Sequence, residues 1–186
     1  MKRVLFSSFI IFLLAPVALY GQGRGVYVAV EAGGMLGLNR QSSLANDQAL
    51  NGYKFHLMFG RNFNDRFYFG LGLGNEVYRA SESAGPFSSR FGILPFLADF
   101  RVPLHHNFLS GTLSVVANAG YAPRIGNDLF RGALAHGGIS YGYPLSFNGP
   151  DLFLTLGYGL QQIVLPYQSN NLQQQTISLT LGLFIN

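Results

Sequence analysis

The chain has 186 residues, of which 48% are hydrophobic and only 11% are charged, and it contains 24 glycines and no cysteine. Without cysteine we expect neither a lipid anchor on an N-terminal cysteine, nor a disulfide-stabilised secreted domain, nor a thiolate metal site. So little charge disfavours a domain whose whole surface faces water and fits a protein whose outside faces lipid.

The first segment, residues 1–21, is predicted to be a secretory signal peptide. A positively charged start precedes residues 4–20, an apolar run that contains no charge. We expect cleavage after Gly21, so that residues 22–186 form one mature domain. The alternative is an uncleaved membrane anchor, for which a run broken by Pro16 is marginal against a spanning helix of roughly 20 residues.

Removal of the signal peptide also changes the charge balance. Loss of Lys2 and Arg3 takes the 12 basic residues to 10 against 8 acidic ones, so the formal net charge falls from +4 to +2. A net charge this small gives no reason to expect a nucleic-acid partner.

After the signal peptide, apolar side chains recur at every second position, which predicts strands with one apolar face and one small or polar face. We find no convincing helical periodicity. The alternation is clearest at the end of the chain, where leucine and isoleucine occupy one face of the last segment. The eight segments are Val26–Gly33, Tyr53–Gly60, Phe67–Glu76, Leu94–Val102, Ser110–Tyr121, Ala133–Tyr143, Leu152–Gln161 and Thr176–Ile185.

The connections between these segments alternate in length. Short connections are predicted at residues 62–65, 104–107 and 147–150, and long ones near residues 38–50, 79–89, 122–132 and 163–171. In an outer-membrane barrel with both termini in the periplasm, short turns face the periplasm and long loops face the exterior. We therefore predict an all-β protein, a transmembrane eight-stranded antiparallel up-and-down β-barrel.

Two prolines interrupt the fourth segment. Pro95 and Pro103 lack the N–H group that a strand ladder needs, so each is expected at a bulge or a strand end. The rival fold is a soluble β-sandwich or a lipocalin-like barrel, which would bury its apolar face and expose its charges. Here the few charges share a face with glycines, and this favours the membrane barrel.

The alternation, the glycine-rich inner face, the rhythm of turns and loops, and the apolar last strand TISLTLGLFIN together resemble the small outer-membrane barrels of Gram-negative bacteria, of the OmpA-barrel and OmpX-like type. The resemblance covers residues 25–186 and indicates architecture more than activity. It implies a location in the cell outer membrane, outer-membrane lipid around the barrel, the barrel-assembly machinery as a partner during insertion, and a monomer. Members of that group usually end on an outward aromatic residue, whereas Phe184 points inward by parity.

Seven titratable side chains fall on the inner face by the same parity. An eight-stranded barrel is narrow enough for side chains to fill it, and isolated buried charges are costly, so we expect opposite charges to pair, with Glu31 near His56 and Lys54 on the adjacent strand. We interpret the network as a plug of the barrel; a pore lining or a catalytic cluster is the functional alternative. The predicted lumen network comprises Glu31, Lys54, His56, Glu76, Asp99, Arg101 and His136.

No catalytic, cofactor-binding or metal site is predicted. His105 and His106 are expected in a short solvated turn beside Asn107, and two adjacent histidines alone do not complete a coordination shell. Some small outer-membrane barrels are lipid-modifying enzymes, so a set of serine, histidine and carboxylate was considered. His136 and Ser140 share a face, but four residues at roughly 3.3 Å each separate them by about 13 Å, too far for a direct hydrogen bond.

The ends of the predicted barrel carry aromatic and polar residues. Girdles at the membrane interfaces would explain the outward aromatic residues, although strand propensity explains any single one equally well. The polar stretch Gln168–Gln175 fits an outer binding surface or a solvated loop tip. The girdle candidates are Tyr53 and Tyr121 toward the loops, and Phe63, Phe67, Tyr143 and Phe147 toward the turns.

These features predict a non-enzymatic integral outer-membrane protein that acts in envelope integrity or surface interaction through its extracellular loops. A narrow porin-like pore is the second hypothesis and a lipid-modifying enzyme the third. The sequence indicates no ligand, cofactor or specific surface partner.

Overall fold

The computed structural model describes residues 25–41, 48–79, 90–126, 129–146, 149–164 and 172–185. The predicted signal peptide and its cleavage site lie outside these ranges, as do Phe147, residues 80–89 and residues 165–171 of the predicted loops. No helix within the described ranges is long and apolar enough to span a membrane.

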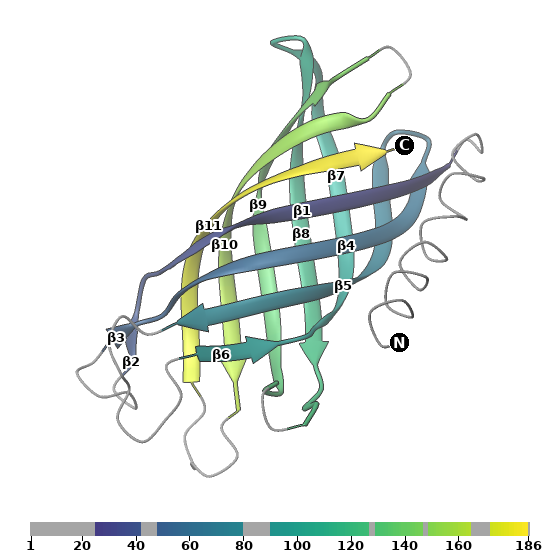
Figure 1. Ribbon diagram of the computed structural model, residues 1–186. Coiled ribbons are helices and arrows are strands. Elements are labelled where there is room, and N and C mark those ends of the chain that lie inside the picture. The colour runs from purple at the N-terminus through teal and green to yellow at the C-terminus, as the bar shows by residue number, and fades with distance from the viewer. Residues whose placement is uncertain are drawn as a thin grey trace, which may run out of the picture.

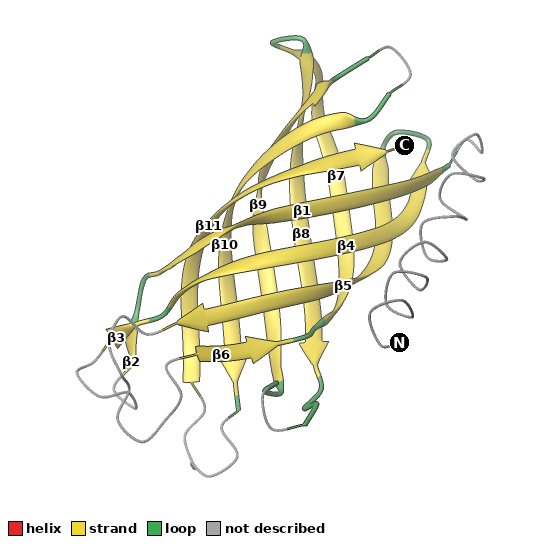
Figure 2. Cartoon of the chain, viewed as in Figure 1, coloured by secondary structure: helices red, strands yellow, loops and turns green. Residues whose placement is uncertain are grey.

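Antiparallel strands make up nearly all of the described chain (Figures 1 and 2). Nine of them form one sheet, and the pairing of β4 with β5 and of β1 with β11 closes it. The strands are β1 (Val26–Gly37), β2 (Arg40–Gln41), β3 (Gln48–Ala49), β4 (Asn51–Phe63), β5 (Phe67–Arg79), β6 (Arg90–Ile93), β7 (Phe96–Phe108), β8 (Gly111–Ala122), β9 (Gly132–Pro144), β10 (Asp151–Ile163) and β11 (Leu172–Ile185).

The barrel has eight strand positions, because β6 and β7 both pair with β5 and follow one another along a single position. Each of the other barrel strands pairs with its neighbours in the sequence, and β2 and β3 form a separate small hairpin. The predicted eight-stranded antiparallel up-and-down barrel is confirmed.

The two faces of each strand differ as period-2 alternation requires. On β11 the side chains of Leu179 and Leu181 are 55% and 53% exposed, whereas the intervening Ser178 and Thr180 are each 1% exposed. Successive side chains of a strand point to opposite faces, so the apolar row lies outside the barrel and the hydroxyl row inside.

Both prolines of the fourth barrel strand lie at irregularities, as predicted. Pro95 lies between β6 and β7, where its carbonyl oxygen accepts a hydrogen bond from the Gly74 N–H at 2.8 Å. Pro103 lies at a register shift in the pairing of β7 with β8. Each proline therefore stands where the ladder is already interrupted and its missing donor costs little.

The predicted short turn at residues 104–107 is wrong. β7 continues to Phe108, and the turn to β8 is Leu109–Ser110. Two register shifts beyond Pro103 keep the end of β7 paired with β8, so the ladder extends further than the alternation of side chains does. The connection between β4 and β5 occupies residues 64–66, and residues 145–146 and 149–150 lie between β9 and β10, both close to the predicted positions.

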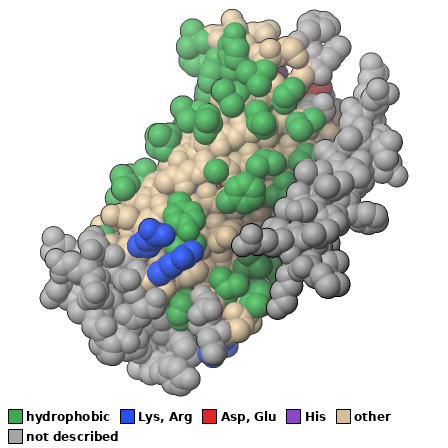
Figure 3. All heavy atoms as spheres, in the orientation of Figure 1, with side chains coloured by type: hydrophobic (Ala, Val, Ile, Leu, Met, Phe, Trp, Pro, Cys, Tyr) green, Lys and Arg blue, Asp and Glu red, His purple; other side chains and the backbone are tan. Residues whose placement is uncertain are grey.

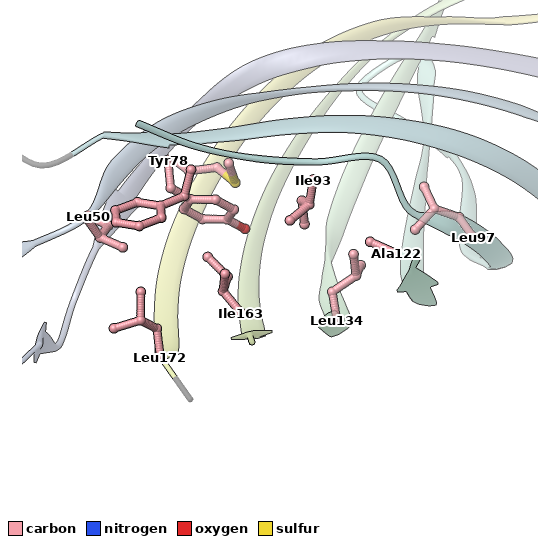
Figure 4. Close-up of a cluster of buried hydrophobic side chains, with 10 residues drawn as sticks. Leu50, Tyr78, Ile93, Leu97, Ala122, Leu134, Ile163 and Leu172 are labelled. Carbon is pink, nitrogen blue, oxygen red and sulfur yellow. The ribbon is translucent and has the colours of Figure 1, made fainter. Parts of the chain in front are cut away.

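These three turns lie at one end of the barrel, which we call the turn end, and the longer connections lie at the other, the loop end. At the loop end the interior is filled by a cluster of buried apolar side chains (Figure 4). This loop-end cluster consists of Met35, Leu50, Tyr78, Phe91, Ile93, Leu97, Ala122, Leu134, Ile163 and Leu172, with Phe130 packed against it. Nine of these side chains come from seven of the eight strand positions and Leu50 from the connection before β4, so together they fill the interior at that end.

A smaller aromatic cluster lies inside the barrel near the turn end. Tyr27, Ala29, Met58 and Phe153 form it, with Tyr68 and Phe184 packed against it. Inward glycines on neighbouring strands make room for the large rings, since a Cβ atom at Gly60 or Gly70 would collide with Tyr27. Figure 3 shows that the outer surface, in contrast, carries hydrophobic side chains along the length of the barrel.

Candidate functional site in the barrel interior

Between the two apolar clusters, the interior holds charged side chains. All seven residues of the predicted lumen network are buried, with exposed fractions between 0% and 7%. They come from β1, β4, β5, β7 and β9, so they line much of the barrel's circumference. The structure brings six of them into direct contacts with one another, in two connected groups.

The first group is a chain of alternating carboxylates and imidazoles. His56 contacts Glu31 Oε1 through Nδ1 at 3.0 Å and Glu76 Oε1 through Nε2 at 2.9 Å. The same Glu76 oxygen lies 3.0 Å from His136 Nε2, and its other oxygen accepts a hydrogen bond from the Tyr78 hydroxyl at 2.6 Å. Because β7 and β8 lie between β5 and β9 in the sheet, the contact between Glu76 and His136 crosses the interior.

The position of His56 between two carboxylates constrains the protonation state of its imidazole. A neutral imidazole donates through one nitrogen only, whereas an ionised carboxylate can only accept. Both ring nitrogens of His56 face carboxylate oxygens. If Glu31 and Glu76 are both ionised, His56 therefore carries both ring protons and a positive charge.

The second group is centred on Arg101. Its Nε donates to Asp99 Oδ2 at 2.9 Å, and one Nη lies 3.9 Å from Glu31, which joins this group to the imidazole chain. The guanidinium carbon also lies 4.9 Å and 5.6 Å from the ring centroids of Phe153 and Phe184. Arginine suits this place because its planar group makes directional hydrogen bonds and stacks on aromatic rings at the same time.

Tyr27 completes the Arg101 group from the opposite wall. Its hydroxyl donates to Asp99 Oδ2 at 2.5 Å, so Asp99 accepts from both a tyrosine and an arginine. Tyr27 belongs to β1 and Asp99 to β7, and the bond therefore spans the barrel. This bond connects β1 to β7 across the interior.

Lys54 is buried beside this network, and its strand-register partner on β5 is Glu76. With His56 protonated, the cations of Lys54, His56 and Arg101 balance the three carboxylates in the interior. Charge balance is what allows ionised groups to persist in a space of low polarity.

The histidines outside the network have different surroundings. His105 and His106 lie on the last part of β7 and are exposed, not in the turn where they were predicted. No group of three or more metal-ligating side chains exists among the described residues. Ser140 Oγ accepts a hydrogen bond from Thr155 Oγ1 at 2.9 Å, while His136 contacts Glu76, so these two residues have separate partners.

No protein-family model matches this chain, and no curated protein matches it. Among solved structures, the crystal structure of Neisserial surface protein A (NspA) is similar, with a TM-score of 0.51 and 15% sequence identity, over 86% of this chain and 96% of that chain. The chain has the fold of a small outer-membrane β-barrel. The resemblance seen in the sequence is thereby confirmed at the level of the fold, and no residue role is transferred at this identity.

Two tyrosines of the interior network of this outer-membrane-type barrel were not among the predicted site residues. Tyr27 has the inward parity of β1, and Tyr78 has that of β5, beyond the predicted end of that strand. The alternation of side chains already places both tyrosines on the inner face, but tyrosine also suits the outer face and the interfaces of such a barrel. Only the distances to Asp99 and Glu76 assign the two hydroxyls to the network.

Proposed function

We propose that this protein is an integral outer-membrane barrel whose interior is closed, and that it acts in envelope integrity or surface interaction through the loop end. One observation carries the proposal: the barrel strands expose rows of apolar side chains, whereas the charged side chains of Glu31, Lys54, Glu76, Asp99 and Arg101 are buried inside, the reverse of a water-soluble protein. Strands of 12 to 14 residues exceed the roughly 9–11 residues that a tilted strand needs to cross a bilayer.

The outward apolar row is continuous around the barrel. Each barrel strand contributes leucine, isoleucine, valine or phenylalanine side chains that are at least one-third exposed, or their half-buried neighbours. Examples from four strands are Leu71 at 64%, Phe100 at 44%, Ile139 at 56% and Leu156 at 60%. An exposed apolar surface of this extent fits contact with lipid.

Aromatic side chains near both ends of the barrel agree with this orientation. Near the turn end, Phe63 stacks on Phe67 at 4.5 Å and Phe67 packs against Phe100 at 5.9 Å between ring centroids. Near the loop end, Tyr53 and Tyr121 are 42% and 55% exposed. Aromatic girdles at two levels are typical of outer-membrane barrels.

A closed interior argues for a role at the surface and against a channel. The loop-end cluster fills one end, and the ion pairs and cross-barrel hydrogen bonds occupy the middle. No catalytic function has a specific observation in its favour among the described residues. We propose outer-membrane lipid as the surroundings, the barrel-assembly machinery as the insertion partner, and a monomer as the working state.

The experiment is expression of the full chain in a Gram-negative host, followed by membrane fractionation and gel electrophoresis with and without boiling. We expect the protein in the outer-membrane fraction, with a band that shifts on boiling because the folded barrel resists detergent. Purified protein should refold into detergent micelles with a β-rich circular dichroism spectrum. Recovery as a soluble periplasmic monomer would overturn the proposal.

A further inference from the structure

Between the charged network and the turn end, side chains fill the barrel interior only partly. A cavity of about 420 Å³ opens there, bounded by β5, β7, β8, β9, β10 and β11. Its lining includes the small residues Ser114, Ser140 and Gly142 of β8 and β9, and the aromatic residues Tyr68, Phe153 and Phe184. Its volume lies within the range of small-molecule sites, roughly 300–1,000 Å³.

Gly142 in the cavity lining differs from the inward glycines against which an aromatic ring of the barrel packs. A Cβ atom at Gly60, Gly70 or Gly182 would collide with Tyr27 or Phe153, so those glycines exist to accommodate large side chains. At Gly142 the nearest atoms to such a Cβ would be Thr112 O at 3.8 Å and Asp151 Cβ at 3.9 Å, ordinary van der Waals contacts. A side-chain atom therefore fits at Gly142 without displacing a neighbour.

The charges around the cavity are mainly acidic. Asp65 and Asp151 both line it, together with Arg101 and His106. The charge of Arg101 is already matched by Asp99 at 2.9 Å and Glu31 at 3.9 Å, and its guanidinium stacks on Phe153. The two aspartates consequently set the sign of the potential in the cavity.

We propose that this turn-end cavity is a binding site for a small organic cation. An ammonium group placed beside Asp151 would form a charge-assisted hydrogen bond, and the apolar part of the ligand would lie against Tyr68 and Phe184. The hydroxyl groups of Ser114 and Ser140, paired on β8 and β9, also line the cavity and can accept or donate further hydrogen bonds. Access from the periplasm rests on the proposed function, whereas the binding itself does not.

The test is a titration of the refolded chain in detergent micelles, monitored by two-dimensional NMR. Three probes are used, each of which contains one benzene ring. Benzylamine, which is protonated to an ammonium at neutral pH, is the cation, benzyl alcohol is its neutral analogue and benzoate is an anion. We expect saturable shifts for the cation, centred on resonances of Ser114, Ser140 and Gly142, and much weaker shifts for the other two. The band shift on boiling verifies the fold of each sample before titration.

Two variants locate the binding. Asp151→Asn removes the charge with little change in shape, and should weaken the affinity for the cation about tenfold, as loss of one charge-assisted contact does. Gly142→Leu fills the cavity and should abolish binding. Its matched control is Gly34→Leu, because a Cβ at Gly34 has no atom within 4 Å, and Gly34 lies on the outer face of β1.

The outcomes separate this inference from the proposed function. Equal affinity for all three probes, binding unaffected by Gly142→Leu, or no saturable binding by wild type that is folded would each overturn the cation site and leave the barrel's membrane role untouched. If Gly142→Leu does not fold, Ser140→Leu on the same strand replaces it. A soluble, folded protein that binds the cation would instead overturn the membrane role alone.

Discussion

Glu31 on β1 and His56 on β4 are direct partners in the strand register, and Glu31 Oε1 lies 3.0 Å from His56 Nδ1. On its other side His56 contacts Glu76 at 2.9 Å, so a single imidazole separates two buried carboxylates. The stability of the interior should therefore depend on this one ring more than on any exposed ion pair.

Replacement of His56 by leucine should lower the free energy of unfolding by roughly 3–5 kcal/mol, because two buried carboxylates lose the cation between them. The triple variant Glu31→Gln, His56→Leu, Glu76→Gln removes the charges together and should be more stable than the single variant. Urea unfolding in lipid vesicles, monitored by circular dichroism, measures the free energy of unfolding of both variants. A single variant as stable as the wild type would show that the network contributes nothing.

Removal of the Tyr27 hydroxyl tests the bond that crosses the barrel. Tyr27→Phe deprives buried Asp99 of a donor at 2.5 Å, and the free energy of unfolding should fall by roughly 1–3 kcal/mol. Tyr158→Phe is the matched control, since Tyr158 is 44% exposed on the outer face, and it should change the value by less than about 0.5 kcal/mol. Similar effects of the two changes would contradict the assignment of Tyr27 to the network.

Arginine substitutions along one outward row test the membrane orientation. Leu179 lies near the middle of β11 and Leu183 near its turn end, and both are exposed. In lipid vesicles Leu179→Arg should cost roughly 2–4 kcal/mol and Leu183→Arg roughly 0–1 kcal/mol, because a charge near the interface reaches water. The folded fraction after refolding measures both. Equal costs would indicate that no hydrocarbon layer surrounds this face.

The close packing of Tyr27 against glycines leads to a prediction for the turn-end cluster. A Cβ at Gly70 would meet the Tyr27 hydroxyl and the Phe59 carbonyl oxygen, so Gly70→Val should lower the free energy of unfolding by roughly 1–3 kcal/mol through overpacking. At Gly34, where the space is open, the same change should be tolerated. Thermal unfolding monitored by the gel shift distinguishes the two, and equal stability of both variants would refute this packing.

Planar-bilayer recordings test the closed interior. We expect no large steady conductance from the purified wild-type monomer, because the loop-end cluster and the charged network occupy the interior of a barrel that side chains can fill. The control is a general porin reconstituted under the same conditions. Large and reproducible steps from the monomer would revive the hypothesis of a narrow pore.

The alternation of side chains determined which residues face inward, since neighbouring positions on any strand point to opposite faces whatever the surroundings. The barrel strands follow it over most of their length, and Lys54, Glu76 and Asp99 are buried together as a result. The prolines were equally informative, because a residue without an N–H group limits the ladder locally. The turn after β7 was misplaced because the bulges that extend β7 to Phe108 depend on pairing with β8.

Partners across the interior were decided only by the tertiary structure. Parity places Tyr27, Glu76 and His136 inside, but it does not say which side chains share a height, since that depends on strand tilt and on the register of the whole closed sheet. The contacts of Tyr27 with Asp99 and of Glu76 with His136 join strands that are not neighbours. The cavity at Gly142 has the same origin, because the space left inside depends on where the large side chains of all the strands meet.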